Sequence, residues 1–528
     1  MASLGSEIMK IEEEIKQLIE RRDGLVKKQQ GLWEGRNDSG VSLVHRLNPD
    51  VLGLIFESSA AHAFDQPLIL SSVCQRWRAT AMNTARLWGN IYIDIPGQMW
   101  FGKAEAGSEL LGLYEEKMRK KEDRLQVWLR RSGNTPLAVF FHAASFPPEK
   151  KDFVLLQIKL SNIIVLHSGR WRSLTLRAPS YLRRLFGEAG DLGNLQMFML
   201  IPTGCSYSRY SPTEEGEYDV SNLVKRVSLR ELLLNEVMDI YRLPVAWDHL
   251  TTLVIEPSWP IKMEMGIWIL SVASRLRDCR MNLSGMKFHG EEMEEIGDAP
   301  LMLTQLESLA LDINLKIGIW ELEDVPGCMR GLGRVVASGL RSLHIYCHPP
   351  CRVEMVNEWP FYSLLGSTVR SLSFNLDGLH ASEIVSVLTQ VPALQTLALT
   401  TITPITVKEI IASLVRGVEG HVLCPKLIEI RIDLRDRYNH SIDVILEEGL
   451  ILLGTRSEET QETARLRKIW GRSNSFPRSR SLADRIKLMR EKGFQIEWQY
   501  STRSQMEEEF RDGDDGEDDP FVEYSYNV

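Results

Sequence analysis

The residues whose spacing comes closest to an enzyme's chemistry are 97–103, Gly-Gln-Met-Trp-Phe-Gly-Lys, which fit the Gly-x4-Gly-Lys pattern of a phosphate-binding loop. The preceding residues 91–95 have the composition of a strand. However, Ala104 stands where the pattern needs a hydroxyl to bind Mg²⁺. The bulky Met-Trp-Phe interior would keep backbone N–H groups away from a phosphate, and no apolar strand ending in Asp stands out downstream. The sequence therefore argues against nucleotide chemistry at this loop.

A second group of side chains has the chemistry of zinc ligands. It consists of His344, Cys347, His348 and Cys351. Two prolines separate the last two candidates, and no second pair with ligand spacing follows, so we expect no structural zinc site. The chain also lacks the Gly-x-Ser-x-Gly motif of a nucleophile elbow and the metal-binding His-Glu-x-x-His motif. We therefore predict that the protein is not an enzyme and has no catalytic residue, metal or cofactor.

Composition limits the class of protein that the chain can form. Its 528 residues are enough for at least two domains, and 44% hydrophobic with 25% charged residues is ordinary for a globular protein. The net charge of −9 disfavours nucleic-acid binding. No charged-then-apolar leader opens the chain, and no apolar run approaches the about 18 residues of a membrane span, so we expect neither secretion nor membrane insertion. Seven scattered cysteines indicate reduced thiols, as in the cytoplasm or nucleus.

The elements that would position any functional side chain come from a repeated phrase, apolar-x-x-apolar-x-apolar. Its ten copies start 21 to 34 residues apart, a period typical of leucine-rich repeats. The copies are 171–176, 195–200, 229–234, 250–255, 276–281, 306–311, 340–345, 369–374, 394–399 and 427–432. Each phrase would end in a short strand. One strand cannot bury its apolar face alone, but stacked strands share a continuous core.

The segments between the phrases complete the predicted fold class, which is α/β. Amphipathic helices at 260–275, 381–390 and 407–417 would cover a convex side, with the parallel strands on the concave side. The uneven spacing predicts an irregular leucine-rich-repeat solenoid over 166–500, with insertions at 206–218 and 316–328. The alternative is a compact α/β domain with crossover helices. Ten similar phrases disfavour it, because one sheet usually holds about 4–6 strands.

Three short amphipathic segments, 43–56, 70–81 and 85–88, precede the repeats. Asn48 can cap the first helix, Pro49 suits the first helical position and Asp50 suits the opening turn. Apolar residues at helical spacing follow in both longer segments: Val51, Leu52, Ile55 and Phe56, then Leu70, Val73, Cys74, Trp77 and Ala81. So small a helical unit buries little surface alone and usually needs a partner or a following domain.

These segments resemble the F-box, the helical module that docks a substrate receptor onto the Skp adaptor of cullin–RING ubiquitin ligases. The similarity is to the F-box-like proteins of mushroom-forming fungi. The matching residues are Arg46, Leu47, Pro49, Leu52, Ile55, Phe56, Val73, Cys74, Trp77, Arg78, Leu87 and Trp88. Asn48 and Ala85 replace prolines of the family pattern. A Trp-Leu-x-Arg-Ser-Gly junction at 128–133 and a His-Ser-x-Arg-Trp run at 167–171 extend the resemblance to about residue 200.

The resemblance implies a protein with two binding functions and no active site of its own. An F-box at 41–95 would bind the Skp adaptor, and after a linking region at 96–165 the solenoid would bind a protein client. The residues expected at the adaptor are Leu47, Pro49, Leu52, Ile55, Phe56, Val73 and Trp77. The candidates for the client are Arg177, Glu256, Asp312, His344, Tyr346, Arg370, Asn375, Arg431 and Asp433. Their mixed charges show no single-sign stripe that would name a phosphodegron or a nucleic acid.

Two other hypotheses remain open. In one, the chain is a leucine-rich interaction scaffold, and its F-box-like helices form a structural cap that packs on the rest of the chain. In the other, the loop at 97–103 belongs to an enzyme. Capture of the Skp adaptor separates the first hypothesis from the ligase subunit, and a nucleotide-binding assay tests the second.

The two ends of the chain differ in composition from the rest. Residues 1–34 contain a heptad-like helix. Its few heptads make a marginal coiled coil, so we expect it to fold back onto the F-box or the solenoid, with weak self-association as the alternative. Residues 501–528 are acidic, and we expect disorder there. The basic segment at 465–492 would pair with that tail or serve as a nuclear address.

Overall fold

The computed structural model forms two compact units, Met1–Tyr92 with Arg119–Ala138, and Ile93–Met118 with Val139–Val528. No helix among the described residues has both the length and the apolar character that a membrane span requires. The structure describes residues 13, 16–17, 20–25, 27–28, 47–60, 66–95, 97, 108–146, 150–201, 220–226, 228–235, 240, 243–256, 260–284, 300–314, 332–348, 364–376, 380–400, 404–417, 422–433, 442–456, 466–473 and 480–500.

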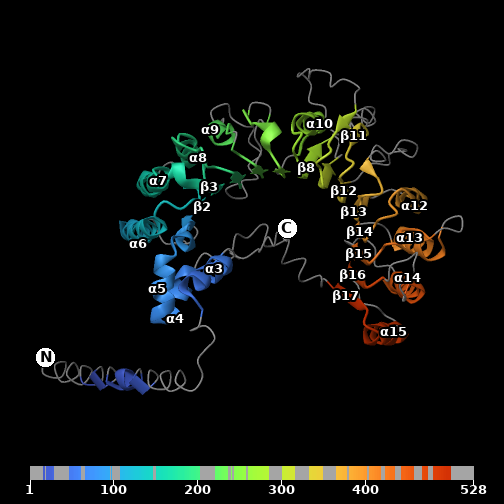
Figure 1. Cartoon of the computed structure of the whole chain (residues 1–528), viewed down its shortest axis with the longest axis horizontal. Coiled ribbons are helices and arrows are strands. Elements are labelled where there is room, and N and C mark those ends of the chain that lie inside the picture. Colours follow the sequence, from blue (N-terminus) through green and yellow to red (C-terminus); the bar gives the residue numbers. More distant parts are fainter. Residues whose placement is uncertain are drawn as a thin grey trace. The chain divides into compact units, whose positions relative to one another are not determined.

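The first unit contains α3 (Pro49–Ala60), α4 (Gln66–Val73), α5 (Gln75–Asn83) and the 3-10 helix η1 (Ala85–Trp88) (Figure 1). Asn48 caps α3 as the sequence predicts. Its carbonyl oxygen accepts a hydrogen bond from the Leu52 N–H at 3.0 Å, and its Oδ1 accepts one from the Asp50 N–H at 3.1 Å. Cys74 separates α4 from α5, and its Sγ accepts a hydrogen bond from the Trp77 N–H.

Trp88 lies at the centre of the core of this unit. Its side chain is fully buried, and its Nε1–H donates a hydrogen bond to the Ala81 carbonyl oxygen at 2.8 Å. Trp128, on α6 (Ser108–Ser132), packs edge-on against it with ring centroids 4.9 Å apart. The Arg131 guanidinium lies 4.3 Å above the Trp88 ring, which adds a cation–π contact. The Leu-Trp pair and the Trp-Leu junction of the sequence pattern thus meet in one core.

The second unit is built on a parallel sheet. In the described part of the chain this sheet has fifteen strands, in the order β1-β2-β3-β4-β5-β6-β8-β10-β12-β13-β14-β15-β16-β17, with β7 beside β8. The described pairings from β3 to β17 are parallel. The strands are β1 (Asn90–Ile95), β2 (Leu137–Ala143), β3 (Trp171–Arg177), β4 (Met197–Leu200), β5 (Glu231–Leu234), β6 (Thr252–Ile255), β7 (Ile261–Lys262), β8 (Asp278–Ser284), β10 (Ser308–Asn314), β12 (Ser342–His348), β13 (Ser371–Leu376), β14 (Thr396–Thr400), β15 (Glu429–Asp433), β16 (Lys468–Ser473) and β17 (Gln495–Tyr500).

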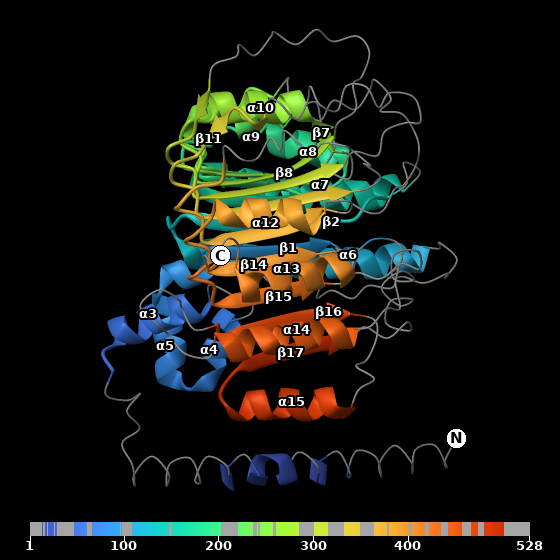
Figure 2. The ribbon, with the colours of Figure 1, turned by 90° about the vertical axis from the view of Figure 1, so that its right-hand side faces the viewer.

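Helices cover one face of this sheet, and the described residues place none on the other face (Figures 1 and 2). The covering helices are α7 (Lys151–Val165), α8 (Ser180–Gly187), α9 (Ser221–Val224), α10 (Met263–Val272), α12 (Ala381–Thr389), α13 (Pro404–Arg416), α14 (Ile442–Thr455) and α15 (Arg480–Glu491). A separate pair of two-residue strands, β9 (Leu301–Met302) and β11 (Val335–Val336), lies outside the large sheet. The fold class is therefore α/β with a large parallel sheet.

The register of the sheet aligns equivalent positions of the repeated phrase. Leu309 on β10 pairs with Leu343 on β12, and Leu343 pairs with Leu372 on β13. The row continues through Leu397 and Ile430 on β14 and β15. All five side chains are buried, so the second apolar position of each phrase forms one continuous core row.

The sheet extends further at both ends than the ten phrases predict. β1 lies inside the range assigned to the F-box module, and β2 lies inside the predicted linking region 96–165. This region also contributes α6 and α7, so it is an integral part of the fold. At the other end, β16 and β17 continue the sheet beyond the last phrase. The unit boundary crosses β1, α6 and β2.

Several predictions from the sequence lie outside the described residues. They include the acidic tail 501–528, both insertions and most of the heptad-like helix in 1–34. The basic segment 465–492 is described only in part, as β16 and α15.

Candidate functional site

The first candidate surface lies on the helices of the first unit, and we name it the apolar helical surface. Its seven side chains are large, apolar and each between 40% and 62% exposed. They are Val51, Leu54 and Ile55 on α3, Leu68, Ile69 and Val73 on α4, and Met82 on α5. Among the described residues, sixteen large apolar side chains are exposed to this degree, and these seven fall within residues 51–82. Exposed apolar side chains gathered in so short a segment make these helices a candidate partner-binding surface.

The seven residues predicted to contact an adaptor divide into three groups. Pro49, Ile55 and Val73 are exposed, and the last two belong to the apolar helical surface. Leu47 and Trp77 are half-buried. Leu52 and Phe56 are buried at 1% exposure each, and the Phe56 ring packs on Trp77 with centroids 5.0 Å apart. Leu52 and Phe56 therefore belong to the core in this arrangement, which differs from the contact role that we expected for them.

Four members of the apolar helical surface are absent from the predicted contact residues: Leu54, Leu68, Ile69 and Met82. Val51 is predicted only as part of the helical pattern. On α3 the exposed residues 51, 54 and 55 repeat at helical spacing, and so do the buried residues 52 and 56. A helix that is apolar on two faces indicates that one face meets the core and the other meets something else. That signal was present in the sequence.

The second candidate surface is the helix-free face of the large sheet, which we name the open face. It is formed by strand residues that alternate with the buried core row. Asp312, His344, Tyr346 and Asp433 lie on it and are partly exposed, and Arg431 is exposed. Arg177 is the last residue of β3, and Glu256 directly follows β6. Arg370 lies one residue before β13 and is exposed. Asn375 is on β13, in register with Tyr346, but its side chain lies outside the described residues. The predicted client residues thus lie on several strands of one sheet.

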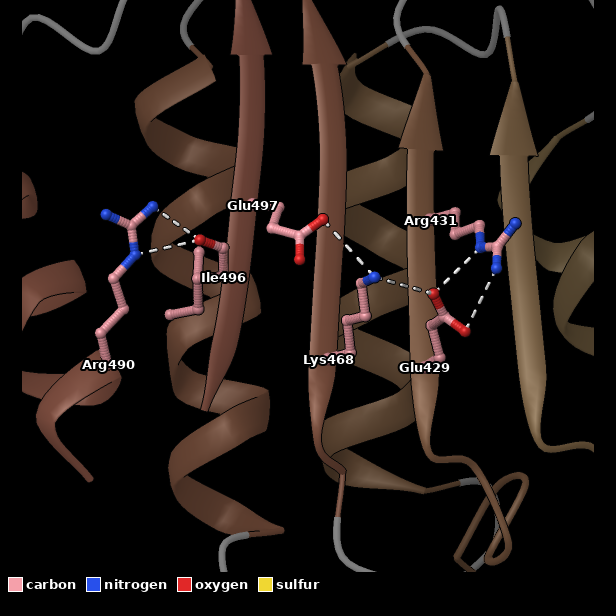
Figure 3. Close-up of polar contacts among 6 residues, drawn as sticks. All are labelled: Glu429, Arg431, Lys468, Arg490, Ile496 and Glu497. Atoms are coloured by element: carbon pink, nitrogen blue, oxygen red, sulfur yellow. Dashed lines mark hydrogen bonds and ion pairs between the residues drawn. The ribbon is translucent and has the colours of Figure 1, made fainter. Parts of the chain in front are cut away.

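Ion pairs already engage some of these charges. Glu429 on β15 lies 3.0 Å from the Arg431 Nε and 4.0 Å from the Lys468 Nζ on β16, and Lys468 lies 3.5 Å from Glu497 on β17 (Figure 3). Arg431 therefore has an acidic neighbour, whereas Arg370 forms no ion pair with any described residue. Near the edge strand, Arg490 of α15 donates two hydrogen bonds to the Ile496 carbonyl oxygen (Figure 3). The β15–β17 end of the open face is charged and internally compensated.

On β12 and β13 the described side chains of the open face carry hydroxyl and imidazole groups in place of ion pairs. The Ser342 Oγ lies 2.8 Å from the His344 Nε2, and the Tyr346 hydroxyl lies 3.3 Å from the Ser373 Oγ. Burial, and then the positive charges of Arg280 and Arg431, hold the pKa of His344 below its ordinary value. The imidazole is therefore neutral near pH 7. It can offer one donor and one acceptor, but no charge.

The sequence motifs with enzyme-like chemistry lie largely outside the described residues. Of the loop 97–103, only Gly97 is described, and the rest lies outside the described residues. Of the zinc-type cluster, His344 lies on the open face, the side chains of Cys347 and His348 are not described, and Cys351 is outside the described part. Within the described residues, no group of three or more His, Cys, Asp or Glu side chains is arranged to hold a metal.

Comparison with known proteins found no match for this chain, either among protein-family models or among curated proteins.

Proposed function

We propose that the protein is a substrate-receptor subunit of a cullin–RING ubiquitin ligase. Its F-box-like helices bind the Skp adaptor, and its sheet, a leucine-rich-repeat solenoid in this proposal, binds a protein client. The observation that carries the proposal is the apolar helical surface, whose residues fall in the same short segment that resembles an F-box. Exposure of seven large apolar side chains is costly in water unless a partner covers them.

The division of the unit into core and surface supports this assignment. Phe56 and Trp77 pack together, so α3 and α5 hold each other in place. Leu54 and Ile69, the two most exposed members of the surface, are then free to contact another protein without unfolding the unit. Catalysis would be supplied by other subunits, and the receptor would contribute proximity between client and ubiquitin-loaded enzyme.

The experiment is a binding measurement between the full chain and a purified Skp adaptor. The test variant is Leu54→Asp with Ile69→Asp, which places two charges in the apolar surface. We expect the affinity to fall about 30-fold or more, because the loss of even one hot-spot residue typically costs about 2 kcal/mol or more. The matched control is Leu155→Asp on α7. Leu155 is 60% exposed, nearly as much as Leu54 at 62%, but it lies outside the apolar helical surface. This control should bind the adaptor as the parent does.

Two results would contradict the proposal. The first is a parent chain that does not bind the adaptor at all, which would make an interaction scaffold without ligase association the better account. Alternatively, the double variant binds as tightly as the parent while its thermal unfolding is unchanged. The second result would separate adaptor binding from the apolar helical surface.

A further inference from the structure

The last described strand of the large sheet, β17, has a neighbour on one side only. β16 pairs with it, and no described strand lies beyond it. The Gln495 N–H donates to the Arg467 carbonyl oxygen at 3.0 Å, so Gln495 directs its backbone groups toward β16. Successive residues of a strand alternate in this respect, so Ile496, Trp498 and Tyr500 direct their backbone N–H and C=O groups away from β16. Another strand can add itself to a sheet through unpaired groups of this kind.

One of these outward groups already has a partner. The Ile496 carbonyl oxygen accepts two hydrogen bonds from the Arg490 guanidinium, from Nε at 3.0 Å and from Nη2 at 2.6 Å. Figure 3 shows Arg490 beside the outer edge of β17, on the side opposite Lys468 of β16. The guanidinium therefore lies where the backbone N–H groups of an added strand would lie. Its charge makes these hydrogen bonds stronger than those that a backbone N–H would offer.

The end of α15 places Arg490 at this edge. Gly493 has a φ of 86°, the left-handed conformation that ends many helices. The Phe494 N–H donates to the Met489 carbonyl oxygen at 3.2 Å, and the Gly493 N–H donates to that of Arg490 at 2.9 Å, which is the hydrogen-bond pattern of a Schellman motif. Met489 and Phe494 are buried. The backbone turn and these buried residues hold α15 against β17, so the Arg490 side chain is not needed to return the chain into the strand.

A second copy of this chain is the partner that fits the edge, because β17 is complementary to itself. When two β17 strands run antiparallel and centre on Trp498, the outward residues of one copy face those of the other. Trp498 then faces its own counterpart, and Ile496 faces Tyr500. Each such pair exchanges two hydrogen bonds, and the pairs at both ends need the Ile496 carbonyl oxygen to which Arg490 is bonded.

We propose that Arg490 closes the outer edge of β17 and so prevents the sheet from pairing with the sheet of a second copy. The guanidinium takes the acceptor that both end pairs need. An added strand would also have to displace a charged side chain from the edge, and such charges are one means by which natural sheets avoid edge-to-edge association. The inference goes beyond the proposed function and does not rest on it, since adaptor binding concerns the helical unit and client binding the open face.

The test compares the full-length parent with Arg490→Met, which keeps a long side chain and removes its donors. Sedimentation velocity over a series of protein concentrations gives the Kd of self-association. We expect Arg490→Met to self-associate at least about tenfold more tightly than the parent, because the pair at each end regains a hydrogen bond. Arg490→Ala, a smaller replacement without donors, should behave in the same way. The matched control is Arg485→Met, which changes an exposed arginine of the same helix and should sediment as the parent does.

Hydrogen–deuterium exchange of the associated Arg490→Met protein locates the new contact. The added protection should fall on the backbone amides of Ile496, Trp498 and Tyr500. The inference is overturned if both Arg490 variants sediment as the parent does, if Arg485→Met associates as tightly as they do, or if the added protection lies outside β17. It is also overturned if both Arg490 variants have a lower melting temperature but show no association, because the contact would then only fasten α15 to the strand.

Discussion

The helical unit and the sheet use apolar residues in opposite ways. On α3, Leu54 is 62% exposed although it belongs to an apolar helix, whereas Leu343 on β12 is 0% exposed. In the sheet, every second residue of a phrase enters a core that neighbouring strands share, so burial follows directly from the pattern. The short helices of the first unit have apolar residues on more sides than the unit can cover. The difference indicates that the sheet buries its own apolar side chains, whereas the helical unit leaves several of its apolar side chains for a partner to cover.

The comparison can be tested most strongly on α3, where a buried and an exposed apolar residue are adjacent. Phe56→Ala removes a buried ring that packs on Trp77 and should lower the free energy of unfolding of the first unit by about 3–5 kcal/mol. Ile55→Ala should change it by less than about 0.5 kcal/mol, because that side chain is half in solvent. Urea titration monitored by tryptophan fluorescence measures both. Similar losses at the two positions would mean that Ile55 also belongs to the core.

A second test applies the same logic to the sheet. Leu343→Ala creates a cavity in the core row and should cost about 2–5 kcal/mol of stability. His344→Ala, one residue along β12, removes a side chain of the open face and should cost about 1 kcal/mol or less, the value of one hydrogen bond. Chemical denaturation of both variants gives the comparison. Equal costs would contradict the alternation of buried and open-face residues along the strands.

The strands could be predicted from the sequence better than the candidate sites could. Each of the ten phrases contains a strand, because an apolar residue at every second position has one stable placement in a covered sheet. β16 does not match the phrase, because Gly471 stands where the phrase needs its last apolar residue. β17 does not match it either, because Phe494 and Ile496 are two residues apart where the phrase needs three. β1 and β2 have strand composition but lack the phrase.

The sites depend on proximity that the sequence does not show. Arg280 and Arg431 are far from His344 along the chain. Only the order of the strands brings their positive charges close enough to lower the pKa of its imidazole. The mixed signs of the open-face residues also hide the charge pattern of the sheet, because only the pairing of β12, β13 and β14 shows that three adjacent strands lack a carboxylate. On α3, helical spacing revealed the apolar faces but could not say which of them the rest of the unit covers.

The smallest predicted effect concerns pH and sharpens the contrast within the sheet. Since the folded pKa of His344 is lower than its ordinary value of 6.5, the unfolded chain takes up a proton first as the pH falls through 6.5. The free energy of unfolding should therefore decrease below that pH. In the His344→Asn variant it should decrease less. Arg431→Gln should raise the pKa of His344, because it removes one of the positive charges that lower it. The imidazole titration in an NMR spectrum checks the direction. A lower pKa in Arg431→Gln would contradict the account.

The most direct test of the central claim is hydrogen–deuterium exchange of the full chain with and without a Skp adaptor. The account predicts that the adaptor slows exchange in α3 and α4, at Pro49–Ala60 and Gln66–Val73, and leaves the strands β3 to β17 unchanged. Protection confined to the sheet, or no protection anywhere at saturating adaptor, would contradict the division of the molecule into an adaptor-binding helical unit and a client-binding sheet.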